Sequence, residues 1–122
     1  MMWIKFGSFF MFLSVALGAF GAHALKSKFT DYQMHVFTTG VLYQFIHALG
    51  LFIVAWLTTQ SSDPKIQLAG IFFTAGIILF SGSLYALSVT QIKWFGPITP
   101  LGGLSFLIGW ALLFFSHYDH IK

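Results

Sequence analysis

Three neighbouring side chains inside one long apolar segment could titrate or bind a ligand. Tyr43, Gln44 and His47 have a spacing that places them on one face of a helix. An ionisable side chain inside a membrane is costly, which makes His47 a candidate for proton transfer or ligand binding. A neutral imidazole that hydrogen-bonds a neighbouring helix would account for it equally well. The sequence leaves both interpretations open.

A second polar group lies in the run FSGSLY, residues 80–85, and contains Ser81, Ser83 and Tyr85. A serine nucleophile needs a general base and an oxyanion site, and His47 is the candidate base if the helices bring it close. No aspartate or glutamate lies inside an apolar segment to orient that imidazole. Serine hydroxyls also bond their own helix backbone readily. The pattern therefore argues against a hydrolase, and we assign no catalytic residue.

Other histidines lie near the ends of the apolar segments. His23 closes the first segment, where it can reach interfacial water or bond the loop after the third segment. His117 and His120 flank Asp119 at a helix-compatible spacing, but two histidines alone are a weak metal signal. The chain has no cysteine. We therefore predict an interfacial tail, no metal site and no cofactor, and the sequence leaves haem, quinone or lipid binding open.

The segments that carry these residues are far more apolar than those of soluble proteins. Hydrophobic residues make up 57% of the 122-residue chain and charged residues 7%, where soluble domains have about 45–50% and about 25%. The chain has too few charged residues to cover the surface of a protein in water. We therefore expect lipid to surround most of its surface. The positive charges are lysines scattered along the chain, for a net charge of +3. Nucleic-acid binding needs clustered charge, so we predict no nucleic-acid partner.

Four apolar segments cover residues 3–25, 35–58, 66–89 and 101–116. Each is near the ~20 residues that a membrane-spanning helix needs, and short links make consecutive helices antiparallel neighbours. We predict an all-α membrane protein with a single domain over residues 1–122, folded as an antiparallel four-transmembrane-helix bundle. An even number of spans puts both termini on one side. The lysines divide equally between the two sides, so the charge count does not set the orientation.

Local signals predict where three of the helices begin. Thr30 with Gln33 fits a capping box. Asp63 before Pro64 fits an N-cap followed by the first helical position, and Thr99 before Pro100 fits the same pattern.

Small residues recur on each predicted helix and predict close helix packing. Ser14, Gly18 and Ala22 are spaced four apart and form one groove of the first helix with Gly21. We predict the same packing role on the other helices. The full set of predicted packing positions is Ser14, Gly18, Gly21, Ala22, Gly40, Gly50, Gly82, Gly102, Gly103 and Gly109.

Four motifs occur in order along nearly the whole chain. They are LGAFGAHAL (17–25), TGVLYQFIHAL (39–49), LFSGSLYAL (79–87) and ITPLGGLSFLIGWALL (98–113). Together they resemble the YgdD / transmembrane protein 256 family, also catalogued as domain-of-unknown-function family 423. The resemblance implies a small four-span protein, in bacteria in the cytoplasmic (inner) membrane, with both termini in the cytoplasm. The biochemical activity of that family is not established, so no catalytic residue can be transferred from it.

The resemblance bears on an alternative for the N-terminus. Ala22-His23-Ala24 after an apolar run fits a signal-peptide cleavage site, and cleavage would leave three spans. The apolar run is long for a signal peptide, and Lys5 is the one early positive charge. The first segment also belongs to the family pattern, so we predict that it stays as a helix.

We predict a non-catalytic, multi-pass bundle that organises the membrane or binds a partner. In this interpretation the glycines of LGAFGAHAL form the contact surface, and His23 is a polar anchor at its end. The candidate polar cluster is His23, Tyr43, Gln44, His47, Ser81, Ser83 and Tyr85. The expected partners are membrane lipids, a second copy of the chain or another membrane protein.

Two alternatives compete with this prediction. One is an oligomeric channel or transporter for protons or a small solute, with His47 as the titrating group. The other is a redox or lipid-modifying enzyme with a bound haem, quinone or lipid, for which the sequence shows no full set of catalytic residues.

Overall fold

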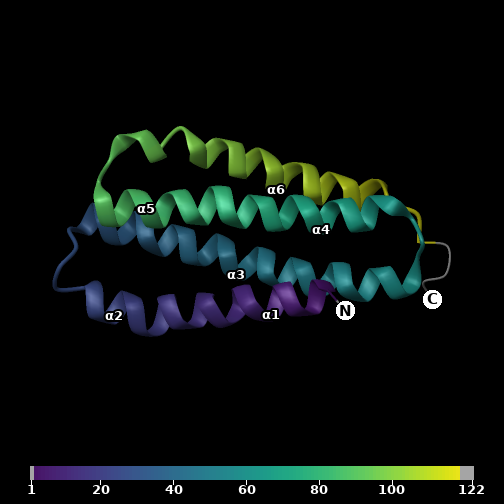
Figure 1. The fold of residues 1–122 in the computed structure, drawn as a ribbon, viewed down its shortest axis with the longest axis horizontal. Helices are drawn as coiled ribbons and strands as arrows, with labels where there is room; N and C mark the ends of the chain where they lie inside the picture. The colour runs from purple at the N-terminus through teal and green to yellow at the C-terminus, as the bar shows by residue number, and fades with distance from the viewer. Residues whose placement is uncertain (1, 119–122) are drawn as a thin grey trace.

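A computed structural model describes residues 2–118 and contains four long helices (Figure 1). The first span consists of α1 (Met2–Val15), the π-helical segment η1 (Ala16–Gly21) and α2 (Ala22–Leu25). The second is α3 (Asp31–Gln60). The third consists of α4 (Pro64–Gly76), the π-helical segment η2 (Ile77–Ser81) and α5 (Gly82–Thr90). A 3-10 turn, η3 (Lys93–Phe95), leads into α6 (Ile98–Phe115).

All four helices are long and apolar enough to cross a membrane. They run alternately up and down, so the start of α1 and the end of α6 lie at the same end of the molecule (Figure 1). No strand occurs within residues 2–118. The predicted all-α, antiparallel four-helix membrane bundle is confirmed.

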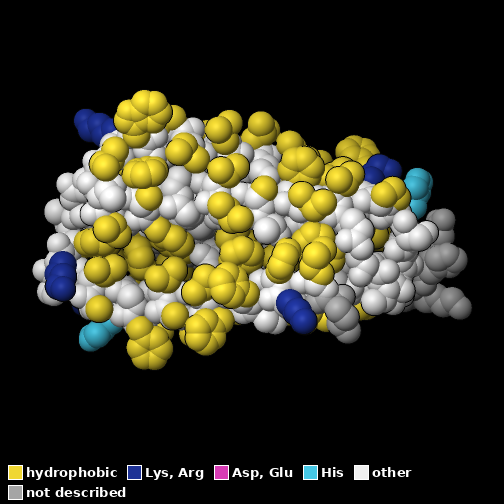
Figure 2. All heavy atoms as spheres, in the orientation of Figure 1, with side chains coloured by type: hydrophobic (Ala, Val, Ile, Leu, Met, Phe, Trp, Pro, Cys, Tyr) yellow, Lys and Arg dark blue, Asp and Glu magenta, His cyan; other side chains and the backbone are white. Residues whose placement is uncertain are grey.

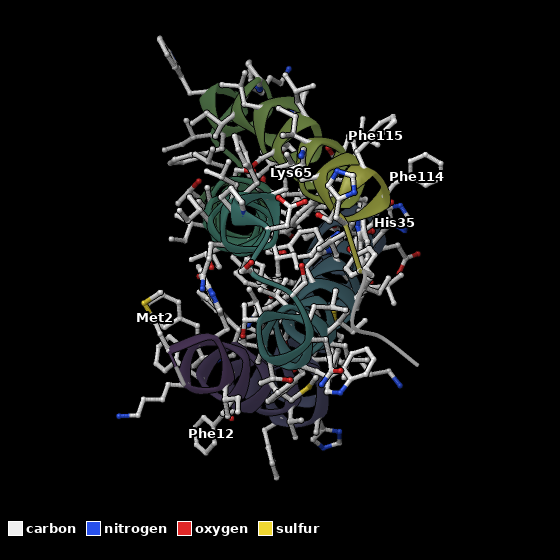
Figure 3. All side chains as sticks on the ribbon, turned by 90° about the vertical axis from the view of Figure 1, so that its right-hand side faces the viewer. Met2, Phe12, His35, Lys65, Phe114 and Phe115 are labelled. Atoms are coloured by element: carbon white, nitrogen blue, oxygen red, sulfur yellow. The ribbon has the colours of Figure 1, made fainter. Side chains whose placement is uncertain are left out.

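The two middle helices form the centre of the bundle. In its most apolar stretch, α3 has 56% of its residues buried and the α4–α5 helix has 44%. α1 packs mainly on α3, and α6 packs mainly on α4 and η2. Seen along the bundle, α1 and α6 therefore occupy opposite corners (Figure 3). The first span is the most exposed, because only 6% of the residues in its most apolar stretch are buried.

The helix starts agree with the sequence signals in two cases. Thr30 and Gln33 form the predicted capping box at the start of α3, and Asp63 caps α4 with Pro64 in its first turn. The prediction for Thr99 is wrong, because α6 begins at Ile98 and Thr99 therefore already lies inside the helix. The Thr99 hydroxyl instead pairs with that of Ser83 at 2.5 Å, which links the start of α6 to α5.

The bundle is tightest where α6 crosses η2. A Cβ added at Gly102 would overlap the backbone nitrogen of Phe80, so only glycine permits this approach. The apolar core continues from this crossing through Phe73 and Phe106 to Trp3. The remaining apolar surface faces outward: hydrophobic side chains spread over the face shown in Figure 2, with the lysines at its margins.

Candidate functional site

Gln44 joins three of the four spans. Its side chain is 2% exposed, and its Nε2 donates to the backbone carbonyl of Phe10 in α1 at 2.8 Å. Its Oε1 accepts a hydrogen bond from the Tyr85 hydroxyl in α5 at 2.6 Å. One amide on the central helix thereby fixes the helices on either side of it.

Close packing at Gly40 brings Tyr85 within reach of Gln44. A Cβ added at Gly40 would lie 2.9 Å from Cε1 of Tyr85, so the tyrosine ring lies almost against the backbone of α3. The hydroxyl of Ser81, which is fully buried, donates to the Gly40 carbonyl at 2.6 Å. The predicted serine is therefore used in a helix contact, with its proton directed at a backbone oxygen.

His47 is held on both ring nitrogens. Its Nδ1 lies 2.8 Å from the backbone carbonyl of Tyr43, and Nε1 of Trp110 in α6 lies 3.0 Å from its Nε2. An indole N–H can only donate, so Nε2 must accept and Nδ1 must carry the proton that it donates to the carbonyl. This tautomer is neutral, and its polar atoms are all paired. The imidazole also stacks on Phe106, with ring centroids 3.5 Å apart and planes 8° apart.

This geometry limits what His47 can do chemically. A second proton would have to enter at Nε2, where the Trp110 N–H already points. Proton uptake or metal ligation therefore requires the Trp110 bond to break. The arrangement matches the second interpretation of the sequence, a neutral imidazole bonded to a neighbouring helix.

The structure divides the seven candidate residues of the polar cluster into separate groups. Gln44, Ser81 and Tyr85 lie together, and Tyr43 lies near His47, packed on Phe80 with ring centroids 4.4 Å apart. The two remaining candidates lie elsewhere.

Ser83 pairs with Thr99 at the start of α6. His23 is exposed on α2. Gly7 packs against Ala48 and Gly21 against Phe37, so His23 lies beyond the level of Phe37 and far along the bundle from His47. The inclusion of His23 in one cluster with His47 is therefore wrong, because the first two helices are antiparallel and place them at different levels.

The glycines of LGAFGAHAL pack inside the bundle. A Cβ at Gly18 would lie 3.1 Å from Val41, and one at Gly21 would lie 3.4 Å from Phe37. Both neighbours belong to α3, so these predicted packing positions contact the second span inside the bundle and do not provide a contact surface for a partner. Ser14 on the same face is fully buried and donates to the Phe10 carbonyl, and Ala22 is half-buried.

The other predicted packing residues differ in how closely they are approached. Gly50 and Gly109 face the ring of Phe73 from α3 and α6. Gly103 is only loosely approached, by Phe80 at 3.9 Å. Gly82 does not fit the prediction, because a Cβ added there would meet no atom within 4 Å.

Two tryptophans complete the polar contacts and were not identified from the sequence. Trp110 donates to His47, and Trp3 donates from Nε1 to Oε1 of Gln67 at 2.6 Å. Trp3 is 4% exposed and covers Gly70. A tryptophan buried in lipid or protein needs a partner for its N–H, and that requirement was the available signal. The sequence does not say which of several acceptors provides it.

The C-terminal end of α6 is fastened to the loop before α4. Asp63 accepts hydrogen bonds from the backbone N–H of Lys65 at 2.9 Å and of His117 at 2.8 Å. The Ser61 hydroxyl donates to the His117 carbonyl at 2.5 Å. These N–H donors lower the pKa of the Asp63 carboxyl below its usual value, the Lys65 N–H contributing most.

The structure describes only the first part of the predicted interfacial tail. His117 is exposed, while Asp119 and His120 lie outside the described residues. Among residues 2–118, no three histidine, aspartate or glutamate side chains gather in a way that could hold a metal ion.

Comparisons with known proteins agree on one family. The family model described as "Protein of unknown function (DUF423)" matches residues 17–103. The UPF0382 membrane protein YwdK of Bacillus subtilis is 51% identical to this chain, over 90% of each protein. A UPF0382 membrane protein of Staphylococcus haemolyticus is 41% identical over 98% of each. The UPF0382 inner membrane protein YgdD of Escherichia coli is 39% identical over 84% of this chain and 78% of its own length.

No solved structure matches the chain. The relatives are named as membrane proteins, and the four apolar helices give this chain the same character. The family model spans most of the chain, from the end of the first span through the second and third spans to the start of the fourth. The chain therefore belongs to the DUF423 family and is a multi-pass integral membrane protein.

Proposed function

We propose that the protein is a non-catalytic bundle that binds another membrane protein through the outer face of its first helix. The observation that supports a non-catalytic role is that the buried polar side chains are hydrogen-bonded. Among the described residues, every buried side-chain nitrogen and oxygen has a hydrogen-bond partner. A catalytic or transport site needs polar groups that are free to act on a ligand.

The outer face of α1 and η1 supports the second part. Ser8, Phe12, Ala16 and Phe20 follow one another every four residues, so small and large side chains alternate along one ridge. The two phenylalanines are 73% and 75% exposed, and a groove of about 460 Å³ lies beside them. Small positions between large ones allow a second membrane helix to approach closely. We infer that the occupant is a transmembrane helix of a partner protein.

Site-specific photo-crosslinking in living cells tests this proposal. A photoreactive phenylalanine analogue replaces Phe12 or Phe20 and, as a matched control, Phe114, which is 80% exposed on α6. Figure 3 shows Phe12 and Phe114 pointing away from opposite sides of the bundle. We expect a discrete protein adduct from positions 12 and 20 and none from 114. Lipid adducts alone at all three positions would contradict the proposal, and an adduct of twice the chain mass would identify a second copy as the occupant instead.

We infer that the protein lies in a bacterial cytoplasmic membrane with both termini in the cytoplasm. The bacterial relatives support the compartment, because one is named as an inner membrane protein. An impermeant thiol reagent tests the orientation, since the chain has no cysteine of its own. Ser27→Cys lies at the end opposite the termini and is expected to react in intact cells. Ser62→Cys is expected to react only after permeabilisation, and the reverse pattern would contradict the orientation.

A further inference from the structure

One pocket lies at the membrane boundary, apart from the polar contacts described above. It has a volume of about 440 Å³ and is lined by Thr30, Tyr32, Leu87, Gln91 and Lys93. These residues come from the start of α3, the end of α5 and the turn η3, which meet at the end of the bundle opposite the termini (Figure 1). The pocket therefore opens where the apolar spans give way to polar loops.

The polar lining of this pocket is rich in hydrogen-bond donors. The Lys93 ammonium, the Tyr32 hydroxyl and the Gln91 amide have no side-chain hydrogen bond or ion pair to another residue within residues 2–118. The Thr30 hydroxyl accepts from the Gln33 N–H and retains its own proton to donate. No carboxylate belongs to the lining. Donors without a competing anion favour a ligand that carries negative charge.

The charged residues near the pocket are mostly positive, like Lys93 in its lining. Lys26 and Lys28 lie in the neighbouring loop at this end, and Asp31 is the only acidic residue there in the described chain. Basic residues at a membrane surface attract anionic lipid headgroups, each contributing modestly. The end as a whole is therefore positive where a lipid phosphate would lie.

Apolar side chains beside the pocket fit the rest of a lipid. Leu87 forms part of its wall, and Val89, Ile92 and Trp94, which are close to the lining residues in the sequence, are 63%, 50% and 82% exposed. Tryptophan and tyrosine favour the headgroup level of a bilayer, so Trp94 and Tyr32 place this region at that depth. A free phosphate ion would use the donors but leave this apolar border without a function.

We propose that this pocket binds the phosphate of an anionic membrane phospholipid, with Lys93, Tyr32 and Gln91 as donors to its oxygens. The acyl chains then lie against Leu87 and the exposed apolar residues beside it. This site shares no residue with the α1 face, so it stands whether or not the proposed partner exists.

Native mass spectrometry of the protein released from lipid nanodiscs tests the proposal. The nanodiscs contain phosphatidylcholine and phosphatidylglycerol, and the readout is the ratio of the two lipids retained on the protein. Lys93→Gln removes the cation from the pocket. Lys26→Gln removes the same charge from the same end without touching the lining. Circular dichroism of both variants confirms equal folding.

We expect wild type to retain phosphatidylglycerol preferentially, and Lys93→Gln to lower that retention about tenfold, because the variant loses a charge-assisted hydrogen bond to the lipid phosphate. Lys26→Gln should have a clearly smaller effect. An equal loss of phosphatidylglycerol retention in the two variants would show a general attraction of the lipid to the positive surface and would contradict a specific site. Equal retention of the two lipids by wild type would overturn its preference for an anion. Inorganic phosphate that competes for the pocket as effectively as the lipid would overturn the assignment of a lipid.

Discussion

Gln44 and His47 show how polar side chains are accommodated inside this bundle at the scale of single residues. Each is almost fully buried, and each uses its polar atoms on a neighbouring helix or on its own backbone. Such bonds avoid the cost of an unpaired polar group in an apolar interior. These hydrogen bonds can form in only one alignment of the helices that they join. The two residues that were the strongest candidates for chemistry in the sequence therefore use their polar atoms in contacts that hold helices together.

The Trp110–His47 bond gives a prediction at this scale. Trp110→Phe removes the donor to His47 Nε2 and leaves that nitrogen buried without a partner, so we expect a loss of about 1 kcal/mol in unfolding free energy. Unfolding in mixed detergent micelles, followed by circular dichroism, measures it. Trp94→Phe is the matched control, because Trp94 is 82% exposed and should have little effect. Equal destabilisation by the two variants would contradict the role of this bond.

At the scale of helices, glycine determines how closely two spans approach. Gly102 meets the backbone of Phe80, while Gly82 faces open space. Both belong to small-residue stripes that look alike in the sequence, and only the rotation of each helix separates them. The π-helical segments η1 and η2 add to this difficulty, because an extra residue in a turn shifts every later side chain around the helix axis.

The two glycines form a matched pair for a second prediction. Gly102→Ala forces α6 away from η2, so we expect a loss of about 1–3 kcal/mol in unfolding free energy. Gly82→Ala places a methyl group in open space and favours the helix, so it should be neutral or stabilising by up to about 1 kcal/mol. The same unfolding assay compares them. Destabilisation by Gly82→Ala that matches that of Gly102→Ala would mean that the helices are rotated differently.

The sequence predicted the spans, their antiparallel order and two helix starts, because these depend on hydropathy, short links and local capping. It did not predict which polar groups meet. The predicted cluster combines His23 with His47, which lie at different levels, and it leaves out Trp110, which bonds His47. The sequence signal for such contacts is weak, since they depend on the rotation and tilt of whole helices. Thr99 is not the cap because α6 begins one residue before it, and its hydroxyl pairs with that of Ser83 on the third span.

At the scale of the whole molecule, one carboxylate connects two spans at the end of the bundle where the termini lie. Asp63 receives backbone N–H groups from both Lys65 and His117, so it connects the start of the third span to the end of the fourth. This contact depends on the charge of one carboxylate that lies outside the spans. The pH of the surrounding water therefore controls it.

The sign of that dependence follows from the pKa of Asp63. The two N–H donors lower it in the folded state, so the stabilisation is complete above the ordinary aspartate value of about 3.9. It is lost as the pH falls through the lower folded value. We expect the midpoint temperature of unfolding to fall below about pH 4 in wild type. Asp63→Asn should lower the midpoint near neutral pH and reduce the acid-induced fall, and an unchanged pH profile in this variant would contradict the contact.

The measurement that tests the central claim most directly is proton flux in proteoliposomes. The claim is that the buried polar side chains hold the bundle together and do not carry protons. His47→Gln is the informative variant, because its amide oxygen can accept the Trp110 hydrogen bond but does not titrate. We predict that wild type and His47→Gln both show only the proton leak of protein-free vesicles. A flux in wild type that His47→Gln abolishes, with the fold intact, would contradict the account and make His47 a proton carrier.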